Sequence, residues 1–378
     1  MKEILVEKIK EAEGKMITYA DYMSLALYDS EIGYYMKTNK KLGTEGDFYT
    51  SSGVHAVFGK VFAHFFLDVI EKEGLPAKIC EFGGGDGRFA KAVIDEWEQL
   101  KPEGKEDLSY AIVEMSPYHR EEQKRLLASK NGFSQYDSLN SLKEQMGKEF
   151  KGVIFSNELI DAFPVHVVER RGDDLYEIYV SIDENDQLIE TSQLGTNQKV
   201  LKWLKRYGPT LNDRQRIEVP LYMNDWIEEI SEFMKKGLLV TIDYGYTKEE
   251  WGMPERKEGS LRGYFKHQLI SNPLLHPTEM DITSHIHIDA YNTVTEENRF
   301  TKIDDLKQNR FLFKLGILKF LQENYDPNPF SEKSKSNRAI QTLINDSGMS
   351  AAFHVFLHSK QLTKTTSYRF LNEDPYKI

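Results

Sequence analysis

The chain has 378 residues, of which 40% are hydrophobic and 12% aromatic, and its formal charge is −11. This composition is typical of a folded chain of one or two domains and excludes a disordered one. The acidic balance disfavours nonspecific binding to nucleic acid or to anionic lipid. We therefore expect no nucleic-acid or membrane partner, whereas a cationic partner is compatible with the charge.

The single cysteine and the first residues of the chain both bear on its compartment. Cys80 has no second cysteine with which to form an internal disulfide, which favours a reducing environment and excludes a cysteine-rich zinc site. Residues 1–15 lack the apolar core of a signal peptide and are too acidic for a mitochondrial transit peptide. No apolar stretch approaches the length of a membrane span. These features predict a cytoplasmic protein.

The first part of the chain predicts a helix, a long loop and a second helix. Residues 18–21 (Thr-Tyr-Ala-Asp) have the pattern of a capping box, so a short helix is expected from there to about Tyr28. Residues 30–52 are rich in glycine, tyrosine and charge and predict a loop. Apolar residues then recur at helical spacing over 54–72. We interpret residues 1–53 as an N-terminal helix with a lid-like loop.

From residue 77 onward, strand and helix patterns alternate along the chain. Continuous apolar strands separated by helices are typical of a parallel sheet covered on both faces, which places the chain in the α/β class. The expected strands are Lys78–Phe82, Ser109–Glu114, Gly152–Ser156 and Leu238–Asp243, and the expected helices are Arg88–Leu100 and Pro117–Ser129.

Other segments interrupt this alternation. Val165–Arg170 and Leu175–Ser181 flank a Gly-Asp-Asp turn and predict a hairpin appended to the sheet. Mostly helical patterns occupy 191–236 and recur within 304–344 around a Pro-Asn-Pro break. We therefore expect a sheet-based core and a second, largely helical lobe. The predicted core comprises residues 54–190 and 237–300, and the predicted lobe comprises residues 191–236 and 301–358.

A glycine-rich loop after the first expected strand is the clearest functional signal. Glycine allows a sharp strand-to-helix turn and lets the backbone contact a ligand with no side chain between them. Acidic residues Glu81 and Asp86 flank the glycines. They would repel a pyrophosphate but attract the ammonium and sulfonium of S-adenosylmethionine (SAM). The predicted cofactor-binding residues here are Glu81, Gly83, Gly85 and Gly87.

Glu114 ends the next strand, where an acid can accept both hydroxyls of a ribose. Residues 85–90 also match the dinucleotide-binding motif, with Glu114 at a suitable distance, so the motif alone does not distinguish an NAD site from a SAM site. The acidic charges favour SAM. An NTPase is excluded because no glycine loop precedes Lys-Ser or Lys-Thr. A glycine-rich turn without a ligand is disfavoured, because four glycines are costly to order unless a ligand requires them. We also assign Asp137 to the cofactor site.

Polar residues follow the third expected strand directly. Side chains at the carboxyl end of a parallel strand project into the ligand crevice. Glu158 and Asp161 are three residues apart, so a helical turn would place both on one face, where they could hold a guanidinium. Acids that interact with the dipole at a helix N-terminus are an equally good interpretation. Asp243 ends another expected strand in the same geometry.

Histidines and a basic–aromatic segment have weaker functional interpretations. Residues 259–267 fit either a half-exposed strand or a substrate contact. His276, His285 and His287 suggest a metal site, but they lack a His-Glu-x-x-His element and a third ligand at helical spacing. We expect no metal. Acyl-transfer chemistry is disfavoured because no Gly-x-Ser-x-Gly elbow is present.

The chain carries its motifs in a fixed order. They are residues 29–35 (Asp-Ser-Glu-Ile-Gly-Tyr-Tyr), 46–51 (Gly-Asp-Phe-Tyr-Thr-Ser), 81–87, 113–117, 157–165, 242–245 and 281–285. This ordered set resembles the MidA-type SAM-dependent methyltransferases, a family that contains the mitochondrial complex I assembly protein-arginine methyltransferase. The resemblance covers roughly residues 18 to 290.

The resemblance implies a class I methyltransferase fold, with a Rossmann-like sheet and an additional, mainly helical lobe. It also implies SAM at the glycine loop and Glu114 on the ribose. Asn157 and Glu158 would then lie near the reacting end of the cofactor. Arginine as the methyl acceptor follows from the resemblance alone.

Methyl transfer requires mainly alignment of acceptor and donor and exclusion of water. Arginine is a poor nucleophile because its pKa exceeds ~12, and a carboxylate pair can orient its guanidinium and localise its charge. We predict this role for Glu158 and Asp161, with Asp243 as the alternative acid. Asp47 and Thr50 are predicted to close the cofactor site as a mobile lid. The predicted catalytic residues are Glu158, Asp161 and Asn157.

The expected partner is a protein substrate with a cationic acceptor, and a homodimer is compatible with the sequence. One alternative function is a catalytically weak, SAM-binding assembly or scaffold protein. The intact glycine loop with Asn157 and Glu158 disfavours it. A second alternative, an NAD-dependent oxidoreductase, lacks a convincing proton-relay residue at the crevice.

Overall fold

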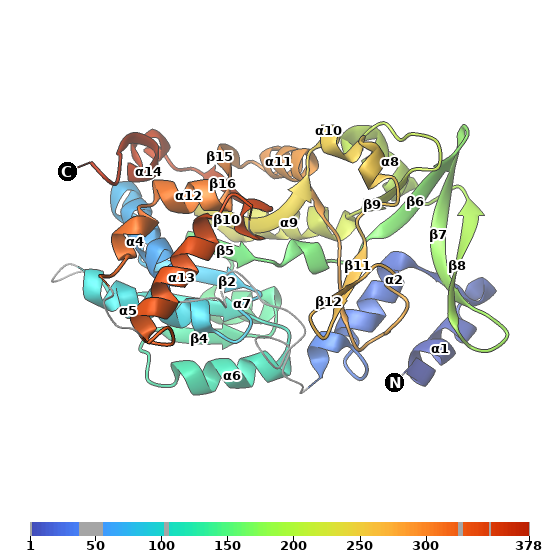
Figure 1. Cartoon of the computed structure of the whole chain (residues 1–378), viewed down its shortest axis with the longest axis horizontal. Coiled ribbons are helices and arrows are strands. Elements are labelled where there is room, and N and C mark those ends of the chain that lie inside the picture. The colour runs from blue at the N-terminus through green and yellow to red at the C-terminus, as the bar shows by residue number, and fades with distance from the viewer. Residues whose placement is uncertain (1, 38–55, 102–105, 324–327, 348, 378) are drawn as a thin grey trace. The chain divides into compact units, whose positions relative to one another are not determined.

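The computed structural model describes residues 2–37, 56–101, 106–323, 328–347 and 349–377. The chain divides into two compact units, each assembled from separate stretches of sequence (Figure 1). Unit 1 comprises Met1–Phe48, Ile160–Glu229 and Gly245–Val294, and unit 2 comprises Tyr49–Leu159, Ile230–Tyr244 and Thr295–Ile378.

Unit 2 is built on the main sheet of the protein, which is eight-stranded: seven strands form its path, and β14 (Ile286–His287) pairs with the end of β10. Its path runs through β15 (Thr301–Lys307), β16 (Phe353–Lys360), β10 (Met234–Tyr246), β5 (Phe150–Asn157), β2 (Lys78–Phe82), β3 (Ser109–Val113) and β4 (Phe133–Tyr136). Neighbours from β10 to β4 are parallel, whereas β16 is antiparallel to both β10 and β15. The α/β class and the mostly parallel sheet expected from the sequence are confirmed.

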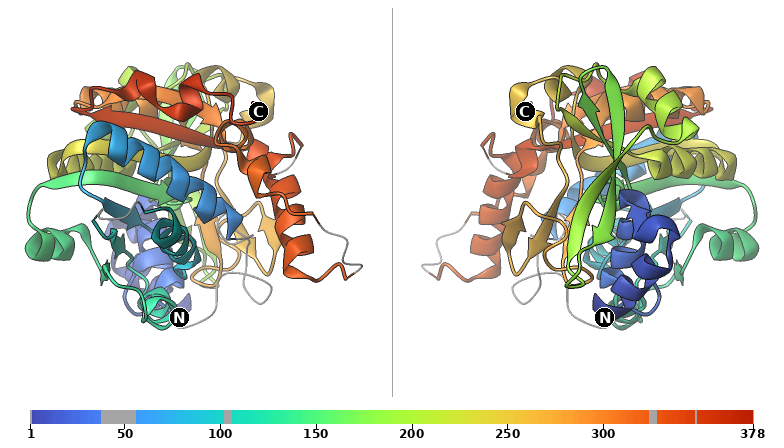
Figure 2. Two further views of the ribbon diagram at one scale, coloured as in Figure 1. Left: turned by 90° about the vertical axis from the view of Figure 1, so that its left-hand side faces the viewer. Right: turned by 90° about the vertical axis from the view of Figure 1, so that its right-hand side faces the viewer.

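Helices cover this sheet and share one hydrophobic core with it. On α4, Phe58, Phe62 and Phe66 recur at helical spacing, and the Phe62 ring lies 5.4 Å from that of Phe155 on β5. Burial of this aromatic stripe explains why the segment is helical. In the left view of Figure 2, α4 (blue) lies along the sheet. The helices of unit 2 are α4 (Val57–Glu73), α5 (Arg88–Leu100), α6 (Pro117–Leu127), α7 (Leu139–Met146), α12 (Gln308–Lys314), α13 (Glu332–Ile344) and α14 (Arg369–Asn372).

Unit 1 holds two antiparallel sheets. The five-stranded sheet runs β1 (Met16–Thr18), β7 (Asp174–Ile182), β6 (His166–Arg171) and β9 (Arg216–Val219), with β8 (Leu188–Leu194) on β7. The three-stranded sheet runs β12 (Gln268–Ile270), β11 (Arg262–Phe265) and β13 (Asp281–Thr283). A separate hydrophobic core forms between these strands and the N-terminal helices.

The helices of unit 1 are short and capped locally. Thr18 accepts a hydrogen bond from the Asp21 amide at 3.0 Å, so the predicted N-cap is confirmed. The helix it starts continues as a π turn, η2 (Ser24–Tyr28). The other helices are α1 (Lys2–Glu11), α2 (Tyr19–Met23), α8 (Gln198–Tyr207) and α10 (Lys248–Trp251), while α9 (Leu221–Phe233) and α11 (Ile288–Glu297) contain residues of both units.

The structure divides the chain differently from the predicted core and helical lobe. The predicted hairpin forms as β6 and β7, but its place in the main sheet was wrong, because β6 pairs with β9 and β7 with β1 and β8. Residues 191–236 contain strand β9 and part of β8 besides helices. Residues 301–358 contain β15 and most of β16, which join the main sheet of unit 2.

Candidate cofactor and acceptor site

The order of strands in unit 2 creates a switch point beside β2. The chain passes from β2 outward to β3 and β4, and then returns to β5 on the other side of β2. In an open parallel sheet, ligands bind outside the carboxyl ends of the strands at such a point. Phe82 at the end of β2 is in register with Val113 on β3 and Ser156 on β5. The glycine loop, Glu114 and Asn157 therefore follow adjacent strand ends.

The glycine loop turns through backbone conformations that only glycine adopts freely. Gly83, Gly85 and Gly87 have φ values of 71°, 51° and 82°. A Cβ at Gly84 would lie 2.6 Å from Ile112 Cγ2 and 3.3 Å from Glu81 Oε2. The loop thus lies directly on β3 and on Glu81, and the predicted strand-to-helix turn is confirmed.

Glu114 holds the loop through its carboxylate. Oε2 accepts the Gly85 N–H at 3.0 Å and Oε1 accepts the Ser116 N–H at 2.8 Å. The residue is 8% exposed, and a carboxylate has further lone pairs beyond these bonds. The carboxylate therefore keeps acceptor capacity beside the loop. The sequence did not reveal Gln123, whose Nε2 donates to Gly85 O at 2.7 Å and fixes the loop from α6.

Glu81 is buried beneath the loop, at 3% exposure. Tyr110 on β3 donates its hydroxyl to Oε2 at 2.9 Å. Burial, reinforced by the nearby charges of Glu114 and Asp86, raises the pKa of Glu81 to about 8, although the Tyr110 bond opposes this. A cation placed on the loop would favour the ionised carboxylate. The location of Glu81 beneath the loop supports the predicted attraction between this carboxylate and a positively charged cofactor. Near neutral pH, the cation must displace the proton that Glu81 carries.

Among the remaining acids of the cofactor prediction, Asp86 and Asp137 have partners of their own. Asp86 pairs with Arg88 Nε at 3.1 Å, so a neighbour offsets the charge that favoured SAM in the sequence argument. Asp137 follows β4 and accepts hydroxyl bonds from Ser138 and Ser141 at the start of α7, which lower its pKa. Asp47 and Thr50 lie outside the residues that the structure describes.

The end of β5 is strained. Glu158 has φ 53°, a left-handed conformation that a non-glycine residue adopts rarely and at a cost of about 1–3 kcal/mol. Its N–H donates to Ile242 O at 2.9 Å, and Asn157 Nδ2 donates to its Oε1 at 3.0 Å. The buried Oδ1 of Asn157 has no hydrogen-bond partner among the described residues. An orphaned buried acceptor beside a strained acid is a mark of a ligand site.

Asp161 lies in unit 1, in the 3₁₀ turn η4 (Ile160–Ala162), and is 5% exposed. Its carbonyl accepts the Ser284 N–H at 2.8 Å. The helical turn expected to align Glu158 with Asp161 does not form, because Glu158 is left-handed. Asp243 on β10 is fully buried and accepts the Tyr244 N–H at 2.9 Å.

The histidines of the weaker metal interpretation pack against aromatic rings. His285 stacks on Tyr246 at 4.3 Å, and His287 stacks on Trp251 at 4.5 Å. Burial lowers the pKa of His285 to about 2 and that of His287 to about 4, so both are neutral. Across the described residues, no group of three or more acids, histidines or cysteines is arranged to hold a metal ion. In the same part of the chain, no helix combines the length and hydrophobicity needed to cross a bilayer.

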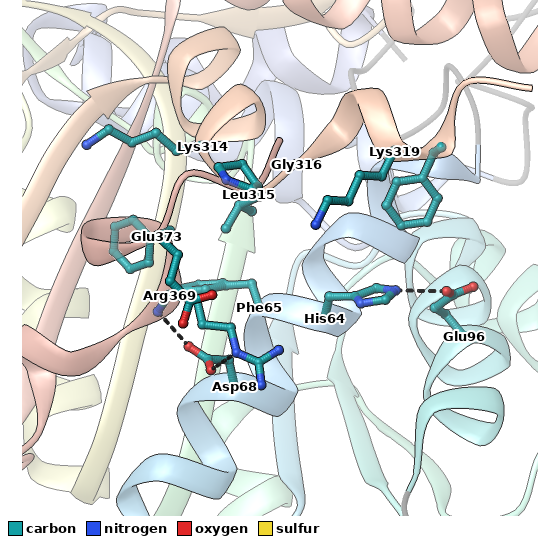
Figure 3. Close-up of a pocket in the computed structure, with 13 residues that line it drawn as sticks. His64, Phe65, Asp68, Glu96, Lys314, Leu315, Gly316, Lys319, Arg369 and Glu373 are labelled. Carbon is teal, nitrogen blue, oxygen red and sulfur yellow. Dashed lines mark hydrogen bonds and ion pairs between the residues drawn. The ribbon is translucent and has the colours of Figure 1, made fainter. Parts of the chain in front are cut away.

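Unit 2 contains a cavity of about 380 Å³ (Figure 3). Helices α4, α12 and α14 contribute to its wall. His64 Nε2 lies 3.0 Å from Glu96 Oε1, and Arg369 Nε lies 3.1 Å from Asp68 Oδ1. Because most of its charged groups are paired and no predicted site residue lines it, we assign it no role.

Comparison with known proteins identifies the family. Residues 61–304 match the model of a family of S-adenosyl-L-methionine-dependent methyltransferases. The mitochondrial protein arginine methyltransferase NDUFAF7 of Danio rerio is 24% identical over 371 residues, covering 90% of this chain and 82% of the relative. The mitochondrial NDUFAF7 homologue of Caenorhabditis elegans is 24% identical over 347 residues, covering 84% and 76%.

A solved structure shows the same fold. The crystal structure of a Burkholderia thailandensis protein bound to S-adenosyl-homocysteine has a TM-score of 0.85 and 25% identity, covering 96% of this chain and 92% of that one. The predicted class I methyltransferase fold is thereby confirmed. The oxidoreductase and scaffold alternatives are not favoured by any of these relatives.

The predicted cytoplasmic location is contradicted, because the curated relatives are mitochondrial proteins. The prediction depended on the acidic N-terminal residues and on Cys80, which is buried in β2. A buried lone thiol is compatible with any reducing compartment, so it could not single out the cytoplasm. With the fold, the glycine loop and the family match in agreement, the chain belongs to the family of SAM-dependent methyltransferases, and its cofactor is SAM.

Proposed function

We propose that the chain transfers the methyl group of SAM to an arginine side chain of a protein substrate. Curated relatives that align with 90% of the chain are named protein arginine methyltransferases, which supports this acceptor. The structural observation that carries the proposal is the Asn157–Glu158 pair at the end of β5. Glu158 is strained there and its carboxylate is held by Asn157, beside the strand that leads into the glycine loop.

The glycine loop and its acids would hold the cofactor. SAM, when bound, supplies an electrophilic methyl group on its sulfonium. Glu114 would accept the ribose hydroxyls, and Glu81 beneath Gly84 would attract the positively charged end. Asp137 would contact the cofactor from the end of β4. The proposed cofactor-binding residues are Glu81, Gly83, Gly85, Gly87, Glu114 and Asp137, together with Asp47 and Thr50.

Glu158 would orient the acceptor. A carboxylate binds a guanidinium through charge-assisted hydrogen bonds and holds its positive charge away from the attacking nitrogen. Asn157 Nδ2 fixes one oxygen of Glu158, which leaves the amide's own Oδ1 facing a donor from the acceptor. The proton that the guanidinium loses passes to the carboxylate and then to water. Asp161 is the second acid proposed to contact the guanidinium.

The acceptor is tested by labelling. Tritiated SAM is incubated with the purified protein and a lysate of cells that lack it, and the labelled protein is hydrolysed to amino acids. We expect the label in methylated arginine. Label confined to another amino acid or to a small molecule would refute the arginine acceptor while leaving SAM-dependent methyl transfer intact.

The role of Glu158 is tested by Glu158→Gln, which keeps the side chain's size and removes its charge. We expect kcat to fall at least about 100-fold, because electrostatic stabilisation of the reacting group is lost. The calorimetric Kd for SAM should change less than twofold. Glu144→Gln on α7, an exposed glutamate, is the control and should leave both values unchanged. Normal turnover of Glu158→Gln would remove this residue from the mechanism.

A further inference from the structure

A cavity of about 480 Å³ lies within unit 1, and none of the residues given a role above lines it. Its lining comes from Tyr19 on α2, from strands β6, β8 and β9, and from residues between 258 and 274. Its size is within the range of cavities that take a small ligand or a long side chain. The charged residues in its lining are Glu190, Arg216, Glu218 and Glu258.

The cavity carries more negative than positive charge. Arg216 is matched by Glu190, whose oxygens lie 2.8 and 2.9 Å from its guanidinium nitrogens. Glu218 is 1% exposed and accepts bonds from Ser260 and from the Leu261 amide. Among the described residues, exposed Glu258 has no ion-pair partner. Burial also raises the pKa of Glu218, so after the Glu190–Arg216 pair is set aside it is Glu258 that favours a cation.

Apolar side chains complete the lining. Val167, Leu261 and Leu274 lie against the cavity together with Leu188, and Ile189 at its edge is 40% exposed. Lysine and arginine pack their methylene stems along apolar surface while the charged head stays among polar groups. The combination of an apolar wall and acidic carboxylates fits such a side chain better than a small inorganic cation or an apolar ligand.

Strand β8 offers backbone hydrogen bonds next to this cavity. In the described part of the chain it pairs with β7 on one side and with no strand on the other. Leu188 and Glu190 are two residues apart, so both side chains point to the same face of the strand. An extended peptide can add to a free edge and place alternate side chains on that face.

We infer that this cavity is a subsite for a basic side chain of the protein substrate, and that the peptide segment carrying it adds to the free edge of β8. The inference rests on the proposed function, since it presumes a protein substrate. The basic residue bound here is distinct from the methylated arginine, whose proposed contacts are Glu158 and Asp161. Substrates with a second basic residue in an extended segment are therefore selected.

The probe is a fluorescein-labelled nonapeptide of alternating threonine and valine with one central arginine, compared with the same peptide carrying norleucine. Fluorescence anisotropy should show at least tenfold tighter binding of the arginine peptide. Glu258→Lys should abolish this preference. Glu255→Lys is the matched control: it makes the same charge change at a nearby exposed glutamate outside the cavity and should keep the preference. Equal binding of both peptides, or equal loss in both variants, would overturn the subsite.

Hydrogen exchange tests the strand edge. On addition of the arginine peptide, amides of β8 should become at least tenfold more protected while those of β9 stay unchanged. Unchanged exchange in β8 would refute the added strand. The inference and the proposed function fail separately. Methylation of arginine without peptide preference would refute only the subsite, whereas peptide preference without any methylated arginine would refute only the acceptor.

Discussion

Glu81 links the stability of unit 2 to the state of the cofactor site. It lies under Gly84, receives the Tyr110 hydroxyl and is raised in pKa to about 8 by its burial. A buried acid with no cation nearby is held in its protonated form. The site is therefore arranged so that a positively charged ligand replaces a proton.

Stability should fall as pH rises because of Glu81. Its folded pKa of about 8 lies above the ordinary value of 4.5, so the folded state binds more protons between these values. The stabilisation is complete below pH 4.5 and is lost as pH rises through 8. Urea unfolding from pH 5 to pH 9 should show a falling free energy of unfolding in the wild type. The fall should be smaller in Glu81→Gln, where Glu218 is left as another buried acid with a raised pKa, and undiminished in the exposed control Glu144→Gln.

The same group predicts proton release on binding. Because the ammonium of S-adenosylhomocysteine favours the ionised carboxylate, binding at pH 7 should release a proton from the wild type. Calorimetry in two buffers with different ionisation enthalpies measures it. If Glu81→Gln released as many protons on binding as the wild type, the positive charge of the ligand would not lie next to Glu81.

The sequence could locate the site residues but not their partners. The glycine loop, Glu114 and the Asn157–Glu158 pair follow strands with strong local signals, so their common edge could be predicted. Tyr110 and Gln123 are 29 and 38 residues away from the groups they bond, and no local pattern connects them. The left-handed backbone at Glu158 also required the structure, since its N–H donates to Ile242 O on the neighbouring strand β10, far away in sequence.

At the scale of elements, acids on α4 fasten the segment that follows β16. Glu73 accepts the amides of Thr363 and Lys364 at 3.1 and 2.7 Å and the Tyr368 hydroxyl at 3.1 Å. Asp68 accepts the Arg369 amide at 3.0 Å. The short helix α14 is thereby fixed against α4, and Phe370 packs on Phe65 with ring centroids 5.4 Å apart.

Glu73→Ala should therefore destabilise the protein by about 2 kcal/mol, because the buried Tyr368 hydroxyl and two part-buried amides would lose their acceptor. Urea unfolding measures this loss. Residues 361–372 should also become the first site of limited proteolysis. Glu71→Ala, two residues earlier and exposed on the same helix, should change neither measurement. If Glu73→Ala and Glu71→Ala had equal effects, the substitutions would be destabilising helix α4 itself and not the hydrogen bonds from Glu73 to the segment after β16.

Elements with local signals were predicted well, and elements that depend on distant pairing were not. β2 and α5 have the expected bounds because the glycine loop punctuates them. The local pattern predicts a helical region where β9 forms, because β9 becomes a strand by pairing with β6, which lies nearly fifty residues earlier. β15 was missed for the same reason, since it gains its strand form from β16. Pairing of this kind is not encoded in the local pattern.

At the scale of the whole molecule, the two units are interleaved in sequence. Each unit takes segments from the beginning, the middle and the later part of the chain. No single cut therefore separates one complete unit from the other. Residues 191–236 and 301–358, predicted to form one helical lobe, contribute mainly to different units, because helical pattern alone does not tell which sheet a segment covers.

The interleaving predicts that unit 2 closes only when β16 is present. β16 pairs with β10 from Gly237–Lys360 to Tyr244–Phe353 and with β15 on its other side, so it covers one edge of β10 and joins β15, which has no other strand partner among the described residues, to the sheet. A chain ending at residue 352 should expose these edges, aggregate and fail to bind S-adenosylhomocysteine. A synthetic peptide of residues 353–378 added during refolding should restore binding, measured by calorimetry. A peptide with the same composition in scrambled order is the control, and normal cofactor binding by the shortened chain alone would show that the sheet closes without its antiparallel strand.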